Sequence, residues 1–425
     1  MKIVCGPPKS RLGRLAKNDV RFVLYGLGVK PSQGSAGATL LKVIQHSKIV
    51  PASPAWDLLS LALSVICADT AVRRSNSPDG WTRQIELKVA VSDPRFWSSH
   101  TALIENQLKF LTTDIWQLEF VGDGLYPEPP KTPAMPNEEC VTLLSGGLDS
   151  FVGAIHLVSE DKKPYAVSQV STGDKHSQSY FASKIGGGLS HLQLNHNVRC
   201  PGENERSQRA RSLIFLAYGV LAATALKRYK GGKTIDLYVC ENGFISINPP
   251  LTAARLGSLS TRTTHPIFIS MFQELLDVAG LRITVRNPYQ FKTKGEMLCE
   301  CKDQAFLAKH AATTTSCGRY AHNNFEHCGR CLPCLIRRAA FHAWGKKDKT
   351  PYVYDDLSKN DVRHARFDDV RCAAIAAAQV EMDGIDALPS TNLNALTMGD
   401  LTRYKSVLTR GINELGKFLS AAGVK

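Results

Sequence analysis

The chain has 425 residues and a formal charge of +14, from 52 Lys and Arg against 38 Asp and Glu. Its 43% hydrophobic and 21% charged residues are typical of a globular chain, which excludes a disordered or low-complexity protein. The longest apolar run, residues 58–68, is too short to span a membrane, and the N-terminus has no secretory apolar core, so we expect a cytoplasmic protein without a membrane segment.

The basic charge leaves two interpretations open. No run of five like charges concentrates it, so it fits a solvated surface as well as a face that binds nucleic acid or phosphate-bearing ligands. The 12 cysteines of a cytoplasmic chain are expected to be thiols, metal ligands or catalysts, because a reducing compartment disfavours disulfides.

The first 121 residues predict a module of helices and strands. Residues 53–73 have apolar side chains at helical spacing after a Ser-Pro start. Residues 85–91 alternate between apolar and polar, the pattern of a half-buried strand. A second helix is predicted over residues 100–112 and a second strand over residues 116–121. We expect an α+β N-terminal module at residues 1–121, without a catalytic constellation.

A proline-rich segment follows this module. Residues 122–139 contain Pro127, Pro129, Pro130, Pro133 and Pro136. Proline fixes the backbone and removes a hydrogen-bond donor, so this segment cannot join a helix or an interior strand. We predict an extended linker at residues 122–139.

After the linker, strands alternate with helices. This order predicts an α/β domain at residues 140–345, a doubly wound parallel sheet with helices on both faces. The predicted strands are residues 140–144, 165–170, 235–240 and 281–285, and the predicted helices are residues 150–158, 209–228 and 266–279.

The last part of the chain, residues 346–425, predicts a helical C-terminal extension. Residues 364–382 are Ala-rich and periodic. A final helix, with Thr397 and Asp400 in capping positions, carries an apolar stripe from Leu401 to Leu419. The stripe is expected to pack in a core or a dimer, not to bind a ligand.

A Gly-rich turn separates the first strand of the α/β domain from its first helix. It reads Ser145-Gly146-Gly147-Leu148-Asp149-Ser150. Two glycines permit a tight turn, and the N–H groups that begin a helix have no partner within it, so the turn predicts an anion cradle. Ser145 and Ser150 add hydroxyl donors, and Asp149 either binds Mg²⁺ or caps the helix. Without the lysine of a kinase-type phosphate loop, the turn is suited to hold a departing pyrophosphate.

Four cysteines cluster near residue 330. The predicted metal ligands are Cys317, Cys328, Cys331 and Cys334. Four sulfurs with no vacant position suit structural Zn²⁺, whereas an iron–sulfur cluster, which uses the same ligands, stays open as an alternative. His322 and His327 lie between the first two ligands and are expected to be bystanders, since the cysteines already fill the site.

The Ser145–Ser150 sequence resembles the motif of the PP-loop ATP pyrophosphatases, which cleave ATP between the α and β phosphates and adenylate a carbonyl or carboxyl oxygen. The resemblance implies a nucleotide site on this turn. Its ATP contacts would be Ser145, Gly146, Gly147, Leu148, Asp149 and Ser150, with Asp149 and Ser150 as catalytic residues.

Together, this turn and the cysteine segment resemble the QueC family, the 7-cyano-7-deazaguanine synthases of queuosine biosynthesis, over about residues 140–344. The resemblance implies a PP-loop or HUP-like nucleotide-binding fold with ATP, Mg²⁺ and Zn²⁺, and a 7-deazaguanine carboxylate that is adenylated and then aminated. It also implies ligand contacts for His176, Arg211 and Lys294, each of which could equally be surface charge.

The chain is longer than a simple synthase at both ends. These additions, with Glu241-Asn242-Gly243 and residues 260–265 as pocket-lining segments, resemble QatC, the QueC-like family of the four-component Qat anti-phage system. That resemblance implies an amine on a partner protein from the same operon as the acceptor, and the N-terminal module is expected to recruit the partner.

Three other functions remain open from the residues. The chain could be a 7-cyano-7-deazaguanine synthase, which would use ammonia as the amine. It could be a tRNA-thiolating enzyme of the PP-loop type, a possibility that the basic charge favours and that would need a sulfur-carrying cysteine near the turn or a redox cluster. It could also be a non-enzymatic zinc protein that binds nucleic acid.

Overall fold

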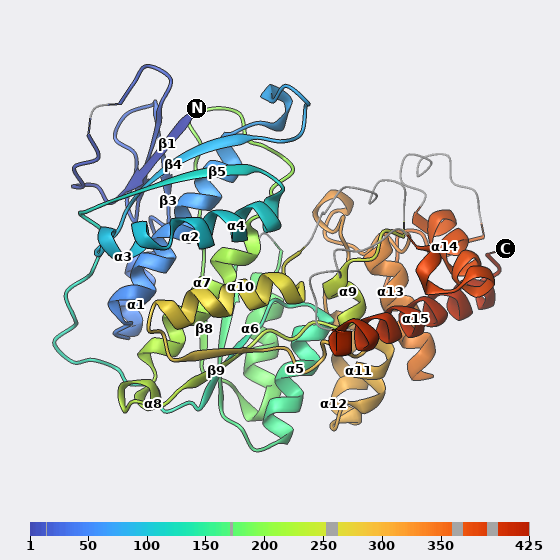
Figure 1. The fold of residues 1–425 in the computed structure, drawn as a ribbon. Helices are drawn as coiled ribbons and strands as arrows, with labels where there is room; N and C mark the ends of the chain where they lie inside the picture. Colours follow the sequence, from blue (N-terminus) through green and yellow to red (C-terminus); the bar gives the residue numbers. More distant parts are fainter. Residues whose placement is uncertain (14, 171–172, 252–261, 359–368, 389–397, 425) are drawn as a thin grey trace.

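The computed structural model describes the chain except for residues 14, 171–172, 252–261, 359–368, 389–397 and 425. Two parallel sheets form its framework, one built by the first 121 residues and the other by the chain after the linker. Figure 1 shows the two sheets with helices between them, and a group of helices from the last third of the chain beside the second sheet.

The first sheet has the strand order β3-β2-β1-β4-β5. Its strands are β1 (Lys2–Gly6), β2 (Val20–Leu24), β3 (Gln33–Ala36), β4 (Gln84–Ala90) and β5 (Ile115–Val121). Every pairing in this sheet is parallel, so the expected α+β module is corrected to a parallel α/β one. The half-buried alternation of β4 arises because one face of the sheet stays polar: Gln84 and Glu86 are exposed, whereas Ile85 and Leu87 are buried.

The helices of this module are α1 (Leu40–Ser47), α2 (Ser53–Ala71), α3 (Pro94–Ser99) and α4 (Thr101–Thr112). Helix α2 is buried on all sides because it lies between the two sheets and packs on α7 (Arg211–Ala225). Among the described residues, α2 alone is long and apolar enough for a membrane span by length and composition, and 89% of that window is buried inside the protein.

The second sheet has the order β10-β9-β6-β7-β8, again entirely parallel, which confirms the doubly wound prediction. Its strands are β6 (Cys140–Leu143), β7 (Pro164–Gln169), β8 (His191–Leu194), β9 (Ile235–Tyr238) and β10 (Ile283–Arg286). Counted from its own first strand, each sheet has the order 3-2-1-4-5. The order reverses between β6 and β9, and parallel sheets bind ligands at the carboxyl ends of strands at such a point.

Helices flank this sheet and continue to the C-terminus. Besides α7 they are α5 (Leu148–Ser159), α6 (Lys175–Lys184), α8 (Lys227–Lys230), α9 (Gly243–Ile247), α10 (Pro266–Val278), α11 (Lys294–Glu300), α12 (Gln304–His310), α13 (Leu332–Trp344), α14 (Asp369–Asp383) and α15 (Met398–Ala421). The apolar stripe of α15 packs on α13, α14 and α9, as the core interpretation predicted. The predicted cap Thr397 and residues 364–368 lie outside the described residues.

One hydrophobic cluster joins both sheets. It contains Ile3 and Val89 of the first sheet, Val141 and Leu237 of the second, and the facing sides of α2 and α7. The sheets therefore share a core, and the predicted boundaries at residues 121, 139 and 345 stay predictions.

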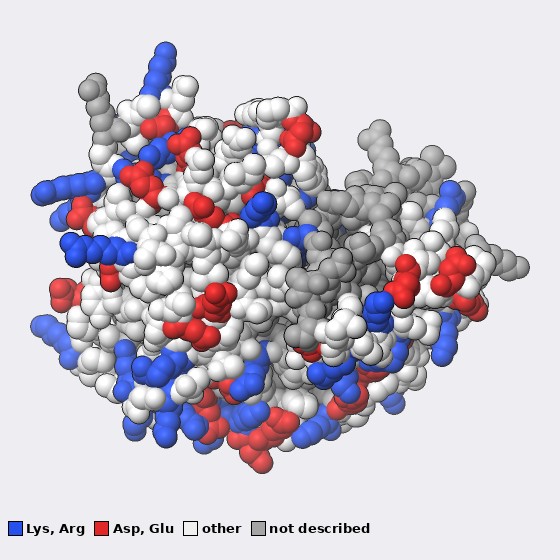
Figure 2. Space-filling view, in the orientation of Figure 1, with Lys and Arg blue, Asp and Glu red and all other residues white. Residues whose placement is uncertain are grey.

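Figure 2 shows one face of the surface, on which Lys and Arg are interspersed with Asp and Glu. On this face the net positive charge is therefore spread out, without a patch of a single sign.

Candidate active site

A cavity of about 460 Å³ opens at the carboxyl ends of β6 and β9, where the strand order reverses. Three parts of the chain that are distant in sequence line it: the Ser145–Ser150 turn, the segment after β9, and the chain on either side of the cysteine cluster. The start of α7 closes one side with Ser212, Phe215 and Leu216.

The Gly-rich turn has the shape that its glycines predict. Gly146 has a φ of +88°, in the left-handed region that favours glycine. Gly147 is the N-cap of α5, and no side chain caps the helix, so its first-turn N–H groups remain available to a ligand. The Gly146 carbonyl accepts a hydrogen bond from the Thr315 N–H at 3.0 Å, which ties the turn to the segment before the cysteines.

The two serines of the turn bond to each other and to the backbone. Their hydroxyl oxygens lie 3.0 Å apart, and the Ser150 hydroxyl donates to the Gly147 carbonyl at 3.0 Å. Gln178 of α6 supports the turn from outside, because its amide donates to the Ser145 carbonyl at 3.2 Å and to the Gln169 carbonyl at 3.0 Å. These contacts fix the shape of the turn without a bound ligand. The sequence analysis did not identify Gln178.

Asp149 lies in a buried network on the floor of the cavity. One of its carboxylate oxygens pairs with the Lys294 ammonium. The other accepts from the Asn242 side-chain amide at 2.6 Å and from the Asn242 N–H at 3.1 Å. Magnesium at Asp149 would have to bind beside the Lys294 ammonium or replace it, and the Mg²⁺ assignment stays a prediction.

A second carboxylate, Glu241, lines the same cavity directly beyond β9. Its side chain accepts a hydrogen bond from the Thr264 hydroxyl. Burial raises the pKa of Glu241 to about 7, and the neighbouring Asp149 charge acts in the same direction. Glu241 therefore changes protonation state near neutral pH.

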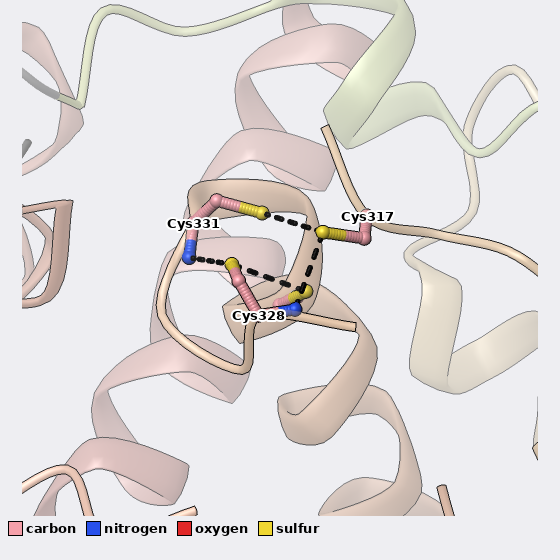
Figure 3. A group of neighbouring side chains, drawn as sticks. Cys317, Cys328 and Cys331 are labelled. Carbon is pink, nitrogen blue, oxygen red and sulfur yellow. Dashed lines mark hydrogen bonds between the residues drawn. The ribbon is translucent and has the colours of Figure 1, made fainter. Parts of the chain in front are cut away.

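The four cysteines converge on one point, and Figure 3 shows the sulfurs of the labelled cysteines directed toward one another. All four Sγ atoms lie within 4.8 Å of one another, with 3.9 Å between Cys317 and Cys331 and between Cys328 and Cys334. A tetrahedral Zn²⁺ with bonds of about 2.3 Å separates its sulfurs by about 3.8 Å, so the residues fit the ion.

The surroundings of the cluster also suit thiolates. Backbone N–H groups of Arg319 and Cys328 donate to the Cys317 sulfur at 3.3 Å, and the Cys331 N–H donates to the Cys328 sulfur at 3.2 Å. The group contains no histidine: His327 instead accepts from the Ser316 N–H at 3.1 Å, as a bystander would.

The cysteine segment builds one wall of the cavity. Ser316, Gly318, Leu332 and Pro333, which adjoin the predicted ligands, all line it. Buried Arg337 of α13 donates to the Thr314 hydroxyl at 2.8 Å and to the Ser316 hydroxyl at 3.2 Å, which fixes this wall to the helix that carries Cys334. A metal in the cluster would thus hold the wall in place.

The part of the chain that forms this wall is similar to a known protein family. Residues 263–345 match the sequence model of the family described as queuosine biosynthesis protein QueC. This segment is therefore similar to the QueC family. The matched segment holds Lys294 and all four cysteines, whereas the Ser145–Ser150 turn precedes it.

Similar proteins include several 7-cyano-7-deazaguanine synthases. Those of Rhizobium etli (strain CIAT 652), Cupriavidus taiwanensis and Hahella chejuensis are 26%, 27% and 26% identical over 264, 245 and 253 residues. The alignments cover 99%, 97% and 96% of the synthases and 54%, 51% and 53% of this chain. Nearly the whole length of these QueC relatives is therefore matched by about half of the chain.

Two of the contacts implied by the QueC resemblance lie away from the cavity lining. His176 is exposed on α6. Arg211 is exposed at the start of α7, where its guanidinium donates to Gln208 at 3.1 and 3.2 Å. Its neighbour Ser212 lines the cavity instead, and the buried Ser212 hydroxyl has no hydrogen-bond partner among the residues that the structure describes. Such an orphaned donor is expected to bond to a ligand.

One cysteine outside the cluster, Cys240, also lines the cavity of this QueC-like site. Burial raises the pKa of its thiol to about 12, so it stays protonated at neutral pH. Of the predicted pocket segments, residues 260–261 lie outside the described residues, while Thr263 and Thr264 line the cavity. Phe244, the residue after the Glu241-Asn242-Gly243 segment, is buried in the core beneath α15.

Proposed function

We propose that this protein uses ATP to activate the carboxylate of a 7-deazaguanine as an acyl-adenylate and then joins the acyl group to an amine. A single observation carries the proposal. The Ser145–Ser150 turn and the QueC family segment line one cavity and are joined by the hydrogen bond between Thr315 and Gly146. The turn that we propose to bind the nucleotide and the segment that matches the QueC family model thus face the same cavity.

In the first step, a carboxylate oxygen of the substrate attacks the α-phosphorus of ATP. The bond from that phosphorus to the bridging oxygen breaks, and pyrophosphate leaves. The available N–H groups at the start of α5 are placed to hold the departing anion, whereas the Ser145 and Ser150 hydroxyls must turn from their contacts within the turn to donate to it. Lys294 supplies a positive charge beside them. No side-chain nucleophile is required.

In the second step, an amine attacks the carbonyl carbon of the adenylate. The amine loses a proton, the bond to the AMP oxygen breaks, and an amide remains. We propose that the amine belongs to a partner protein, as in the anti-phage family that the chain resembles. The N-terminal module supports this: it lies outside the matched QueC segment, and one face of its sheet is polar and exposed.

A second candidate is favoured by the printed name of the relatives, 7-cyano-7-deazaguanine synthase. Here ammonia is the amine, and a further ATP-driven dehydration converts the amide to the nitrile. A tRNA-thiolating activity has less support, because the cysteine that lines the cavity, Cys240, is held as a neutral thiol and thiolates are the nucleophilic form.

The experiment is to incubate the purified protein with ATP and 7-carboxy-7-deazaguanine, and to measure AMP and pyrophosphate by chromatography. We expect both products in equal amounts and only when the acid is present. Mass spectrometry with ammonia, and separately with proteins from the same operon, then identifies the amine: a nitrile supports the synthase, and a mass increase on a protein supports conjugation. Absence of AMP with the acid would refute the proposal.

A further inference from the structure

Glu241 lines the cavity, and among the described residues its carboxylate forms no ion pair, although the Lys294 charge acts to lower its pKa. Among the described residues, the partner that the structure gives to this carboxylate is the Thr264 hydroxyl, which donates to one of its oxygens. The lysine of the cavity, Lys294, is already paired with Asp149. A carboxylate can accept about four hydrogen bonds, so most of the capacity of Glu241 is unused.

Burying such a carboxylate in its ionised form costs free energy unless hydrogen-bond donors reach it. Burial raises the pKa of Glu241 to about 7, which is the same cost expressed as a preference for the neutral form. Because the side chain lines a ligand cavity, the missing donors are expected to come from the ligand. The ligand should therefore present N–H groups to Glu241.

The walls next to Glu241 suit a flat ring. Phe215 and Leu216 of α7, Val239 beyond β9 and Leu332 of α13 give the cavity apolar sides. Glu241 follows β9, and the anion-binding turn follows the neighbouring strand β6. A ligand could therefore place a heterocycle against Glu241 while its carboxylate points toward the turn.

Resting on the proposed function, we infer that Glu241 binds the pyrimidine edge of the 7-deazaguanine and determines the choice of base. That edge presents a ring N–H and a 2-amino group side by side, both donors, and a carboxylate accepts both at once. The edge of adenine presents one donor and one acceptor, which an ionised carboxylate does not match. Thr264 orients the carboxylate through one lone pair of one oxygen, and the remaining lone pairs of both oxygens stay free for the base.

The test uses two acids, 7-carboxy-7-deazaguanine and its analogue without the 2-amino group, with AMP formation as the readout. Wild-type protein should prefer the first acid by 10-fold or more in kcat/KM, because a site built for a donor rejects an analogue that lacks it. Glu241→Gln replaces one acceptor by a donor at nearly constant size. It should lower kcat/KM for the first acid about 10- to 100-fold and reduce the preference to about threefold or less, with the KM for ATP within about twofold of wild type.

The controls separate a local effect from misfolding. Glu300→Gln changes an exposed glutamate of α11 that pairs with Lys292 and should change nothing. Thr264→Val removes only the orienting hydroxyl and should lower kcat/KM for the first acid alone. If Glu241→Gln does not fold, the kcat/KM of Thr264→Val for the two acids tests the inference in its place.

Two results would overturn the inference: an unchanged preference in Glu241→Gln, or an equal loss for ATP, which would place adenine at Glu241. Calorimetric binding of 7-carboxy-7-deazaguanine to wild type and variant measures the same contact without turnover. Failure of the proposed function therefore shows as missing AMP, whereas failure of this inference shows as equal binding by the two proteins.

Discussion

Lys294 and Asp149 form a buried ion pair on the floor of the cavity, although 145 positions separate them in the chain. Asp149 belongs to the turn motif and Lys294 is implied by a resemblance, and nothing in the sequence pairs the two residues. The partnership depends on α11 being brought against the start of α5. A short motif predicts contacts among its own residues, and a pairing over this distance is set by the tertiary fold.

This pairing leads to a prediction for Lys294→Met, which keeps the length of the side chain and removes its charge. The variant leaves Asp149 buried beside the pyrophosphate position without a cation, so negative charge that develops there is no longer offset. We expect AMP formation to fall at least 100-fold. The free energy of unfolding should decrease by about 2 to 4 kcal/mol, because the buried ion pair is broken. The control is Lys292→Met, an exposed lysine two residues earlier that pairs with Glu300. A full-activity Lys294→Met protein would remove this lysine from the proposed mechanism.

The parts of the candidate site that lie within one short segment could be predicted from the sequence. The Ser145–Ser150 turn and the four cysteines are short patterns with a physical reason, and the structure brings each set together. His176 and Arg211 came from single-residue similarity, and both are exposed outside the cavity lining. Gln178 has no sequence signal, because its role depends only on where α6 lies relative to the turn.

At the scale of elements, the cysteine segment is a short loop that must hold its shape beside the cavity. Its backbone N–H groups bond to sulfur, and its flanking residues line the ligand space. Structural zinc sites contribute directly to folding free energy. Loss of a ligand should therefore disturb the cavity wall together with the metal.

We predict that Cys331→Ser loses the metal and melts at least 10 °C lower, with loss of AMP formation. Elemental analysis of the wild type should give one zinc per chain and no iron, which also decides between zinc and an iron–sulfur cluster. Cys299→Ser, at an exposed position outside the cluster, should keep the metal and the melting temperature. Full zinc content in Cys331→Ser would show that the four sulfurs do not bind it together.

Another element, α10, begins with an unusual cap. His265 is buried, and its Nδ1 accepts a hydrogen bond from the Ile267 N–H at 3.3 Å, which requires that nitrogen to be unprotonated. Burial, followed by the nearby Arg262 charge, lowers the pKa of His265 to about 3. The unfolded chain has an ordinary histidine pKa near 6.5, so it binds more protons than the native state between these two values.

These two pKa values determine the direction in which stability changes with pH. The contribution of His265 to stability is complete above pH 6.5 and is lost as the pH falls toward 3, by about 1.4 kcal/mol for each pH unit inside this window. His265→Asn keeps an acceptor at the cap and cannot titrate there. Urea unfolding at pH 7 and pH 5.5 should show that the variant loses about 1 kcal/mol less than wild type over this interval. Equal losses in the two proteins would mean that His265 has the same pKa in the native state as in the unfolded chain.

At the scale of the whole molecule, two parallel sheets enclose one pair of helices. Helices α2 and α7 run between the sheets and are tied at both ends: the Thr224 hydroxyl accepts from the Ala52 N–H at 3.1 Å, and Asp69 accepts from the Arg209 N–H at 2.7 Å. Because α7 also carries Ser212 and Phe215 into the cavity, the N-terminal module supports the active-site wall. Deleting it to test partner recruitment would uncover the buried face of α7.

The sequence predicted the second sheet better than the first. In the second, alternating strands and helices specify parallel pairing directly, although the four-residue strand β8 was missed because it is too short for a periodic signal. In the first sheet, β1, β2 and β3 were missed, and the two predicted strands alone do not specify parallel pairing. Parallel sheets are usually covered on both faces, whereas one face of β4 and β5 in this parallel sheet is polar and exposed.

The joint between the modules can be tested at Asp69, a fully buried residue at the end of α2. One of its oxygens pairs with Arg83 at 2.6 Å, and the other accepts from the N–H groups of Arg209 and Ala210 at 2.7 and 2.9 Å, at the start of α7. Asp69→Ala leaves these backbone donors unsatisfied and Arg83 with Asp114 as its remaining carboxylate. We expect a loss of about 3 to 5 kcal/mol in the free energy of unfolding.

The readout uses one probe on each side of the joint. Circular dichroism follows the helices of the whole chain, and release of zinc to a colorimetric chelator reports the cysteine segment. Because both sheets share a core, both transitions should move together to lower urea in Asp69→Ala. Asp386→Ala, an exposed aspartate paired with Lys405, should shift them by less than about 1 kcal/mol. If zinc release stays at its wild-type midpoint while part of the helical signal is lost early, the two sheets unfold independently and α2 does not support the active site.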